Sequence, residues 1–472
     1  MNAVPDTCSA VFGKTVADVA STWGRSLLKR WINPVLEPRS REKLRLISEK
    51  WLQLDRSLRL PQQAAGRSNN SCGATYGIME QCNFACTSCY LSDIANHTPA
   101  LPFAKVQEQL DALRACLGPT GKAQITSGEV TLLDPDELGK IIAYARGIGL
   151  DPMLMTNGQR LLQAPGYLPL LISKYGLEKI CIHIDTTQKG RKGLIGSMTE
   201  EAIHPIRDQF ASLIKSVRKK TGRKLHAAQA ITITERNFAD ISRVMRWMLG
   251  NLDSFRMISF QPVAKVGRTR DQVDTTINHE SVWSEICKGL GRSLNRHAMY
   301  FGHPECSTVC PVIVVSFGTR HEFIETVRTD KSWDQRFFSK ILRKFGGFNS
   351  VHADPMQTSL KLLSLLIRNP DILLELPFYS LYRLWGIRSW FFSFMAHVLS
   401  LRPIRIRPLA IVVHKFMSAE ELRTPAGRER LRACVFRVPA DGHMVSMCKL
   451  NATSMRRELN RRAQQKQPSQ AF

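Results

Sequence analysis

Residues 74–90 of this 472-residue chain read ATYGIMEQCNFACTSCY, a short β-type run that is followed at once by three closely spaced cysteines. From residue 72 to about 265, such runs alternate with longer segments of helical periodicity. We expect strands at residues 74–79, 122–126, 152–155, 179–184, 225–233 and 256–261. Between them we expect helices, such as those at residues 103–116, 136–147, 201–219 and 237–249. Six strand–helix repeats predict an α/β fold, in which parallel strands joined by right-handed crossovers form a partial, open (β/α)6 barrel.

The chain before and around this barrel has a different composition. Residues 1–70 read as a helical N-terminal extension, in which 16–31 and 44–54 carry apolar residues at helical spacing. We assign residues 71–300 to the barrel, because the alternating pattern is confined to this part. Chemistry in parallel barrels lies at the C-terminal ends of the strands, and the motifs described below follow strands at that end.

The rest of the chain is mixed. Residues 301–457 read as a cysteine-containing α+β region with three apolar, basic helices at 359–367, 372–385 and 390–401. The basic, glutamine-rich end of the chain, residues 458–472, is predicted to be disordered.

Composition limits the possible classes of function. Apolar residues make up 43% of the chain, which excludes a wholly disordered protein. The net charge of +26 indicates an anionic partner, which could be a nucleic acid, a membrane surface or an acidic small molecule. The polar start of the chain, residues 1–10, lacks the pattern of a secretory signal, so we expect a cytoplasmic protein with reduced thiols.

The three cysteines Cys82, Cys86 and Cys89 have the spacing CxxxCxxC and directly follow the first expected strand. Three thiolates at this spacing can bind three irons of a cubane cluster and leave the fourth iron open to a substrate. A structural zinc site is the first alternative, but zinc requires a fourth ligand, and the next candidate is the distant His97. Three cysteines buried by chance in a core are the second alternative.

This motif resembles that of the radical S-adenosylmethionine (SAM) superfamily. The resemblance implies that Cys82, Cys86 and Cys89 hold a catalytic 4Fe–4S cluster, and that SAM chelates its open iron. One electron from the reduced cluster then cleaves SAM to a 5′-deoxyadenosyl radical, which abstracts hydrogen from the substrate. Members of the family often have an aromatic residue before the third cysteine, where this chain has Ser88 and places Tyr90 after the cysteine.

Three further segments resemble the SAM-binding elements of the family. Ser127, Gly128 and Glu129 match its Gly-Gly-Glu loop, which receives the SAM amino group, although Ser127 replaces the first glycine. Asn157, in a Thr-Asn-Gly segment, and Asp185, after the fourth strand, match positions that contact SAM or substrate. Each segment could instead be an ordinary turn, and Asp185 could cap a helix or pair with Arg191.

A second group of cysteines lies near the end of the chain. Cys306 and Cys310 form a CxxxC loop, and Cys434 and Cys448 flank a hairpin turn expected at Asp441-Gly442. If the hairpin packs beside the loop, Cys306, Cys310, Cys434 and Cys448 provide four thiolates for an auxiliary iron–sulfur cluster. A four-cysteine zinc site and metal-free cysteines are the alternatives.

Several of these segments together resemble one branch of the superfamily, which holds the tetraether lipid synthases and enzymes described as dihydropterin methyltransferases. The segments are Gln-Pro-Val at 261–263, Gly-Arg at 267–268, His-Pro-Glu-Cys at 303–306 and the cysteine segment 434–451. This resemblance implies C–C bond formation or methylation on a lipid or another hydrophobic metabolite, with an electron donor of the flavodoxin or ferredoxin type.

The apolar helices within residues 359–401 indicate what kind of partner the protein binds. Their tryptophans, phenylalanines and arginines suit peripheral contact with an anionic membrane on its inner face, although the helices could simply cover the barrel as core. A radical SAM enzyme that matures a peptide is a second hypothesis. A nucleic-acid-binding protein is the rival from another class, and the scattered arrangement of the basic residues argues against it.

Overall fold

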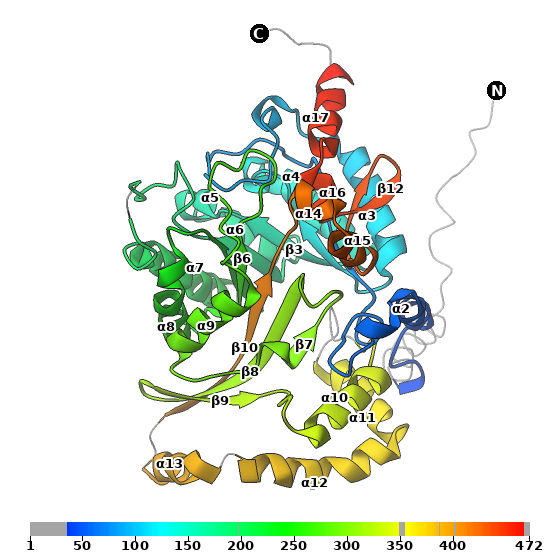
Figure 1. Ribbon diagram of the computed structural model, residues 1–472, viewed down its shortest axis with the longest axis vertical. Coiled ribbons are helices and arrows are strands. Elements are labelled where there is room, and N and C mark those ends of the chain that lie inside the picture. Colours follow the sequence, from blue (N-terminus) through cyan, green and yellow to red (C-terminus); the bar gives the residue numbers. More distant parts are fainter. Residues whose placement is uncertain (1–34, 197, 349–354, 387, 401–402, 467–472) are drawn as a thin grey trace, which may run out of the picture.

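The computed structural model describes residues 35–196, 198–348, 355–386, 388–400 and 403–466 (Figure 1). The helix expected at 16–31 lies outside these residues. The helix expected at 44–54 is confirmed as α2 (Arg41–Gln53), where the Ser40 side chain accepts a hydrogen bond from the Lys43 backbone N–H as an N-cap.

Five of the six expected strands are confirmed within a 12-stranded sheet. The first was expected at residues 74–79, but the strand there covers only residues 72–74, and 75–79 leave the sheet as a loop in which Gly77 has a φ of +72°. Each of the six strands pairs in parallel with the next along the chain, as the strand–helix alternation predicts. These strands are β1 (Cys72–Ala74), β2 (Lys122–Ile125), β3 (Asp151–Thr156), β4 (Lys179–His183), β5 (His226–Ile233) and β6 (Phe255–Pro262).

The C-terminal region adds a further parallel strand to each edge of this sheet. At one edge β10 (Ile404–His414) pairs with β6, and at the other β11 (Phe436–Ala440) pairs with β1. The partial barrel thus has eight parallel strands, with antiparallel strands beyond both edges. These outer strands are β12 (His443–Ser446), β8 (Ser307–Phe317), β7 (Met299–Tyr300) and β9 (Arg320–Glu325).

Helices cover the outside of the parallel strands (Figure 1). In α3, Val106, Leu110, Leu113 and Leu117 recur at helical spacing and are buried in the main core. The covering helices are α3 (Phe103–Leu117), α4 (Pro135–Gly147), α5 (Gln159–Gln163), α6 (Tyr167–Ser173), α7 (His204–Thr221), α8 (Ile241–Gly250) and α9 (His279–Leu290). Short 3-10 turns lie at Arg56–Leu58, Ala95–His97, Val130–Leu132, Phe238–Asp240 and Arg296–Ala298.

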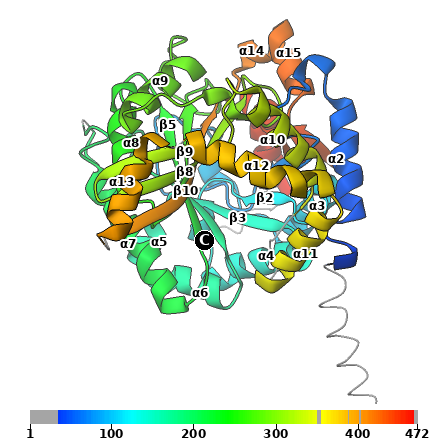
Figure 2. The ribbon, with the colours of Figure 1, turned by 90° about the horizontal axis from the view of Figure 1, so that it is seen from below.

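The apolar helices form a layer at one end of the molecule (Figure 2). They are α11 (Pro355–Ile367), α12 (Pro370–Gly386) and α13 (Arg388–Leu399), and α10 (Ser332–Lys344) lies beside them. Most of their large apolar side chains are exposed to solvent, and only a few, such as Trp390, are buried, so these helices cover the barrel as core only in small part. No helix within the described ranges has the length and hydropathy needed to cross a membrane.

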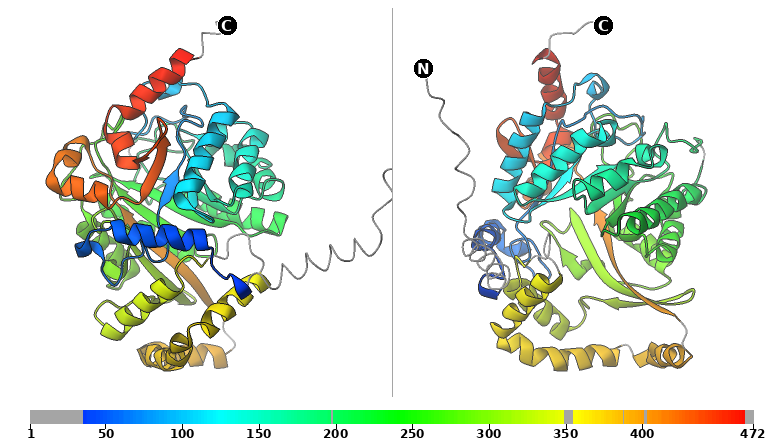
Figure 3. Two further views of the ribbon diagram at one scale, coloured as in Figure 1. Left: turned by 90° about the vertical axis from the view of Figure 1, so that its right-hand side faces the viewer. Right: turned by 180° about the vertical axis from the view of Figure 1, so that it is seen from behind.

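The opposite end of the molecule carries the last helix (Figure 3). Residues 455–466 form α17 (Met455–Lys466), so the expected disorder from residue 458 is wrong for this part, and 467–472 lie outside the described residues. Its side chains Arg456 and Asn460 are buried against the barrel, which explains why a basic sequence forms an ordered helix here. The remaining C-terminal helices are α14 (Ala419–Arg423), α15 (Pro425–Arg432) and α16 (Met447–Ala452).

Candidate functional site

A cavity of about 350 Å³ occupies the interior of the barrel and the C-terminal ends of its strands. The predicted residues Cys82, Cys86, Cys89, Ser127, Gly128, Glu129 and Asn157 all line it. Asp185 does not, whereas His183 and Gln261 do. The structure therefore brings the cysteine loop and both predicted SAM-binding loops to one cavity.

The cysteine loop is held from two sides by the loops that follow β4 and β6. The backbone N–H of Ala85 donates to the Lys189 carbonyl at 2.8 Å, and that of Thr87 donates to the Thr187 carbonyl at 2.8 Å. On the other side, the Arg268 N–H donates to the carbonyl of Cys89 at 3.0 Å. These backbone contacts fix the conformation of the loop without using the three thiols.

The thiols of Cys82, Cys86 and Cys89 lie close enough to influence one another electrostatically. Burial is the main cause that raises the pKa of Cys82 to about 11 and that of Cys86 well above its usual range, and the neighbouring thiolates act in the same direction. Arg268 compensates in part, since its Nε donates to the Cys89 Sγ at 3.4 Å. Among the described residues, no three His, Cys, Asp or Glu side chains converge as a formed metal site.

This donor set fits an iron–sulfur cluster. The three cysteines line one cavity, and a guanidinium beside them offsets the negative charge that three thiolates bring. Arg268 was not predicted as a site residue. The Gly-Arg pair after the sixth strand was a sequence signal for it. In the structure, Gly267 has a φ of +53° and packs directly on the Tyr90 carbonyl, which places the next residue, Arg268, beside the cysteine loop.

The loop after β2 packs directly on the segment that precedes the cysteines. The Gly128 N–H donates to the Met79 carbonyl at 2.9 Å, and the Glu129 N–H donates to the Gln81 carbonyl at 2.9 Å. A Cβ at Gly128 would lie 2.2 Å from the Glu80 carbonyl oxygen. Gly128 thus permits the close approach of two protein segments.

We therefore expect Gly128→Ala to lower the free energy of unfolding by about 1–3 kcal/mol, the usual cost of an added methyl group without space. Urea unfolding of both proteins measures this difference. Gly147→Ala is the matched control, because a Cβ at Gly147 of α4 meets no atom within 4 Å. An equal effect in both variants would contradict the close approach at Gly128.

Glu129 and Asn157 connect the loops after β2 and β3. The Glu129 carboxylate accepts hydrogen bonds from the Thr156 hydroxyl at 2.6 Å and from the Asn157 N–H at 2.6 Å. The Asn157 side-chain amide donates a hydrogen bond to the side-chain oxygen Oδ1 of Asn83 at 2.8 Å. Both residues line the cavity, so their polar atoms lie beside the cysteine loop.

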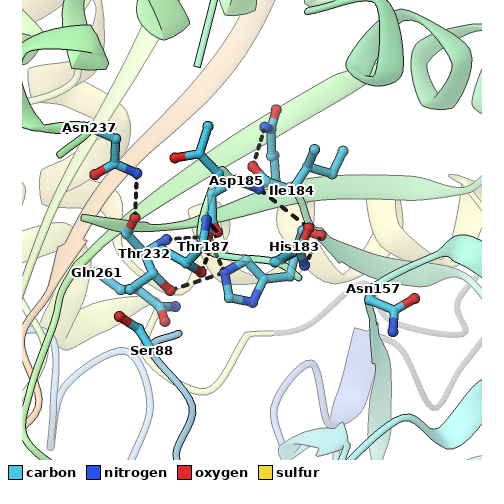
Figure 4. Close-up of polar contacts among 12 residues, drawn as sticks. Ser88, Asn157, His183, Ile184, Asp185, Thr187, Thr232, Asn237 and Gln261 are labelled. Carbon is cyan, nitrogen blue, oxygen red and sulfur yellow. Dashed lines mark hydrogen bonds and ion pairs between the residues drawn. The ribbon is translucent and has the colours of Figure 1, made fainter. Parts of the chain in front are cut away.

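His183 and Asp185 form a pair at the end of β4 (Figure 4). The Nε2 of His183 lies 2.6 Å from Asp185 Oδ2 and 3.1 Å from the Thr232 hydroxyl. Burial by itself raises the pKa of Asp185, but His183 and the donors of Thr187 and Thr232 outweigh it and hold this pKa at about 2. The Asp185 carboxylate thus orients His183, and it is His183 that reaches the cavity.

Sequence reasoning missed His183, although strand alternation was a signal for it. Cys181 and His183 are two positions apart in β4, and both line the cavity. The alternative pairing of Asp185 with Arg191 is not formed, because Arg191 donates instead to the Gln188 side chain and to the Asn157 carbonyl, each at 2.7 Å.

A buried polar network joins α17 to the cysteine loop. The Glu80 carboxylate accepts hydrogen bonds from Arg456 at 2.7 Å, from Asn460 at 3.1 Å and from the Ser127 hydroxyl. The Arg456 guanidinium also lies 5.0 Å from the centre of the Tyr90 ring, and the Tyr90 hydroxyl donates to the Ser127 carbonyl. Glu80 and Arg456 are both almost inaccessible to solvent. This network positions the loop of residues 127–129 relative to the cysteines.

The second cysteine group is only partly assembled. Cys306, Cys434 and Cys448 influence one another electrostatically, and burial raises the pKa of Cys448 to about 12. The Nε of Arg430 donates to the Cys306 Sγ at 3.3 Å, as Arg268 does at the first group. The expected turn at Asp441-Gly442 is confirmed, with φ values of 52° and 75°.

The structure does not bring Cys310 to this group. Cys310 is paired with Ile411 in the middle of the sheet and is buried in the main hydrophobic core. Its electrostatic neighbours are Glu325 and Cys287. Cys72, which was not predicted, lines the main cavity and lies within electrostatic range of Cys434.

Comparisons with known proteins gave structural likenesses alone. No family model matches the sequence, and no curated protein is significantly similar to it. A crystal structure of Streptococcus suis SuiB bound to S-adenosylmethionine is 14% identical, with a TM-score of 0.31 over 43% of this chain and 44% of that one. Native anSMEcpe with bound AdoMet is 13% identical, with a TM-score of 0.33 over 47% and 59% of the two chains.

Methylornithine synthase (PylB) is another similar structure. It is 13% identical, with a TM-score of 0.32 over 60% of this chain and 75% of that one. The aligned part spans less than half of the length of the SuiB chain.

Proposed function

We propose that this protein is a radical SAM enzyme, which reductively cleaves SAM at a 4Fe–4S cluster to give a 5′-deoxyadenosyl radical. The observation that carries this proposal is the cavity at the C-terminal end of the parallel strands. The CxxxCxxC cysteines, the Ser-Gly-Glu loop and Asn157 line it together. A structural zinc site does not require two further polar loops beside its thiols.

Cys82, Cys86 and Cys89 would hold the cluster, which when bound supplies one electron to SAM. The other residues act as binding and orienting groups. Glu129 provides a carboxylate for the ammonium group of SAM, and the Thr156 hydroxyl and Asn157 N–H hold that carboxylate in place. His183 offers a hydrogen-bonding ring to the cavity, and Asp185 fixes its orientation.

The lining deeper in the barrel supports a hydrophobic substrate. Met153, Met155, Met257 and Cys181 pack together, and all of them line the cavity. Flexible thioether side chains adapt to apolar ligands of irregular shape. Together with the resemblance to the tetraether lipid synthase branch, this supports C–C bond formation or methylation on a lipid or another hydrophobic metabolite.

An auxiliary iron–sulfur cluster is the second part of the proposal. Cys306, Cys434 and Cys448 supply three thiols, and Arg430 beside Cys306 offsets their charge. With Cys310 in the core, a fourth ligand has to come from another residue or from a bound molecule. A flavodoxin or ferredoxin would supply the electron.

The test is an anaerobic assay of the protein reconstituted with iron and sulfide. After reduction with dithionite, SAM is added, and 5′-deoxyadenosine and iron per chain are measured. We expect 5′-deoxyadenosine to form and iron to approach about eight per chain, which corresponds to two 4Fe–4S clusters. Zinc binding with intact SAM would overturn the proposal, and about four irons per chain with SAM cleavage would overturn the auxiliary cluster alone.

A further inference from the structure

The outward face of α12 is apolar along its whole length. Leu374, Phe378, Leu381 and Trp385 recur at intervals of four, three and four residues and so share one side of the helix. Their exposed fractions lie between 65% and 71%. A helix at the surface of a water-soluble protein turns its polar side outward, and α12 has the reverse arrangement.

The inward face of α12 is held to α10 by polar and aromatic contacts. Glu375 accepts a hydrogen bond from the Trp333 indole at 2.8 Å, and Tyr379 stacks on Phe337 with ring centres 4.0 Å apart. Arg383 forms an ion pair with the buried Asp334 at 3.1 Å. These contacts fix the orientation of the helix, so the apolar stripe is a stable feature of the surface.

The stripe continues on the neighbouring helices, which lie in the same layer in Figures 1 and 2. Phe392, Met395 and Leu399 of α13 are exposed at helical spacing, and Phe392 reaches 80%. Trp390 and Phe394, on the other side of α13, pack against Phe317 of β8. The outward stripe of α12 and α13, with Leu362, Leu363 and Ile367 of α11, is called the apolar face below.

The charges around the apolar face are positive. Lys361, Arg368 and Arg388 lie on or directly beside α11 and α13, and the Arg388 guanidinium lies 5.2 Å from the centre of the Trp385 ring. Each acidic residue described in α10–α13 is ion-paired to a basic residue: Asp334 to Arg328, Asp371 to Lys344 and Glu375 to Lys340. The charge that remains uncompensated on the described residues of these four helices is therefore basic.

We propose that the apolar face docks the protein on the surface of an anionic phospholipid bilayer. A one-sided apolar stripe with aromatic residues and a basic border is the pattern of a helix that lies in the plane of a membrane interface. A second copy of this chain fits less well, because a symmetric contact would place one basic border against the other. The inference goes beyond the proposed chemistry and does not depend on it.

The face is joined to the cavity by continuous strands. Phe317 and Ile404 lie at one end of β8 and β10 and pack with Trp390. Ser307 and His414, at the other end of the same strands, pair with each other and line the cavity. Docking through α12 and α13 would therefore hold the barrel in a fixed orientation on the bilayer.

The test is vesicle flotation of the full chain with phosphatidylcholine vesicles, alone or with about one-third phosphatidylglycerol. The double variant Trp385→Ser/Phe392→Ser removes two highly exposed side chains of the face. The matched control is Leu52→Ser/Ile195→Ser, whose native side chains are 72% and 73% exposed on other elements. We expect at least a tenfold loss of binding to anionic vesicles in the face variant and no change in the control.

Added salt and removal of phosphatidylglycerol are expected to weaken binding of the unaltered protein. Equal loss in both double variants, or no flotation of the unaltered protein, would overturn the proposal. Sedimentation without vesicles provides a second readout, because a dimer that dissociates only in the face variant would assign the face to a second copy instead. Equal binding to neutral and anionic vesicles would overturn the anionic assignment.

Discussion

Replacing Cys86 by alanine is expected to abolish 5′-deoxyadenosine formation and to lower the iron content by about four atoms per chain, the content of one 4Fe–4S cluster. The reason is that Cys86 is the middle ligand of the CxxxCxxC motif and faces the same cavity as Cys82 and Cys89. Two remaining thiols cannot replace three as ligands of a site-differentiated cubane cluster. The measurements are the anaerobic SAM assay and iron analysis of the reconstituted protein.

Cys116→Ala is the matched control, because Cys116 is half-buried beside the main core and does not line the cavity. We expect this variant to keep both its iron and its SAM cleavage. If Cys86→Ala still cleaved SAM at the normal rate, the assignment of the catalytic cysteines would be wrong. If both variants lost iron equally, the loss would reflect damage to the fold.

Replacing Arg456 by methionine is expected to lower the free energy of unfolding by about 3–5 kcal/mol, the usual cost of leaving a buried charge without its partner. Arg456 and Glu80 are among the most buried charged residues, with side-chain exposures of 4% and 0%, and they are paired at 2.7 Å. Methionine keeps much of the apolar volume, so the loss reports the unpaired carboxylate. Urea unfolding measures the change.

The double variant Glu80→Gln/Arg456→Met supplies the control for this prediction. Because glutamine carries no charge, we expect the double variant to recover part of the stability that Arg456→Met loses. Arg461→Met provides a second comparison on the same helix, since Arg461 pairs with Glu458 at the exposed surface. A loss below about 1 kcal/mol in Arg456→Met, similar to that expected of Arg461→Met, would contradict a structural role for the network.

The barrel strands could be predicted from the sequence because each is a short apolar run bounded by a helix of regular period. The ends of β2 to β6 lie within about two residues of the expected ranges. The location of the site at the ends of these strands could also be predicted, because the C-terminal ends of parallel strands meet at one edge of the sheet. Cys82 was predicted from the CxxxCxxC spacing, and Glu129 and Asn157 from the resemblance to the radical SAM family; all three line the cavity.

Features that depend on contacts between distant segments could not be predicted in the same way. The strand β10 has basic residues at alternate positions, Arg405 and Arg407, and nothing in its pattern shows that it pairs with β6. The strand β11 was recognised only as one arm of a hairpin, although its other edge pairs with β1. The placement of Cys310 also depends on tertiary packing, since strand pairing turns it into the core.

Most of the helix α17 was predicted to be disordered for a related reason, because the contacts that order it come from a distant segment. Its sequence is basic and polar, which is typical of a disordered tail when local composition is considered alone. The structure stabilises it through Arg456 and Asn460, whose partner Glu80 lies near the other end of the chain.

The pairing of β11 with β1 has a consequence for the synthesis of this protein. While a ribosome is still making the C-terminal region, Cys72–Ala74 has no strand on one side, and an unpaired edge of this kind invites aggregation. Contacts between segments so far apart along the chain also form slowly. Since Arg456 and Asn460 are the partners of the buried Glu80, the hydrogen bonds of this carboxylate, beside the cysteine loop, are completed only after α17 has been synthesised.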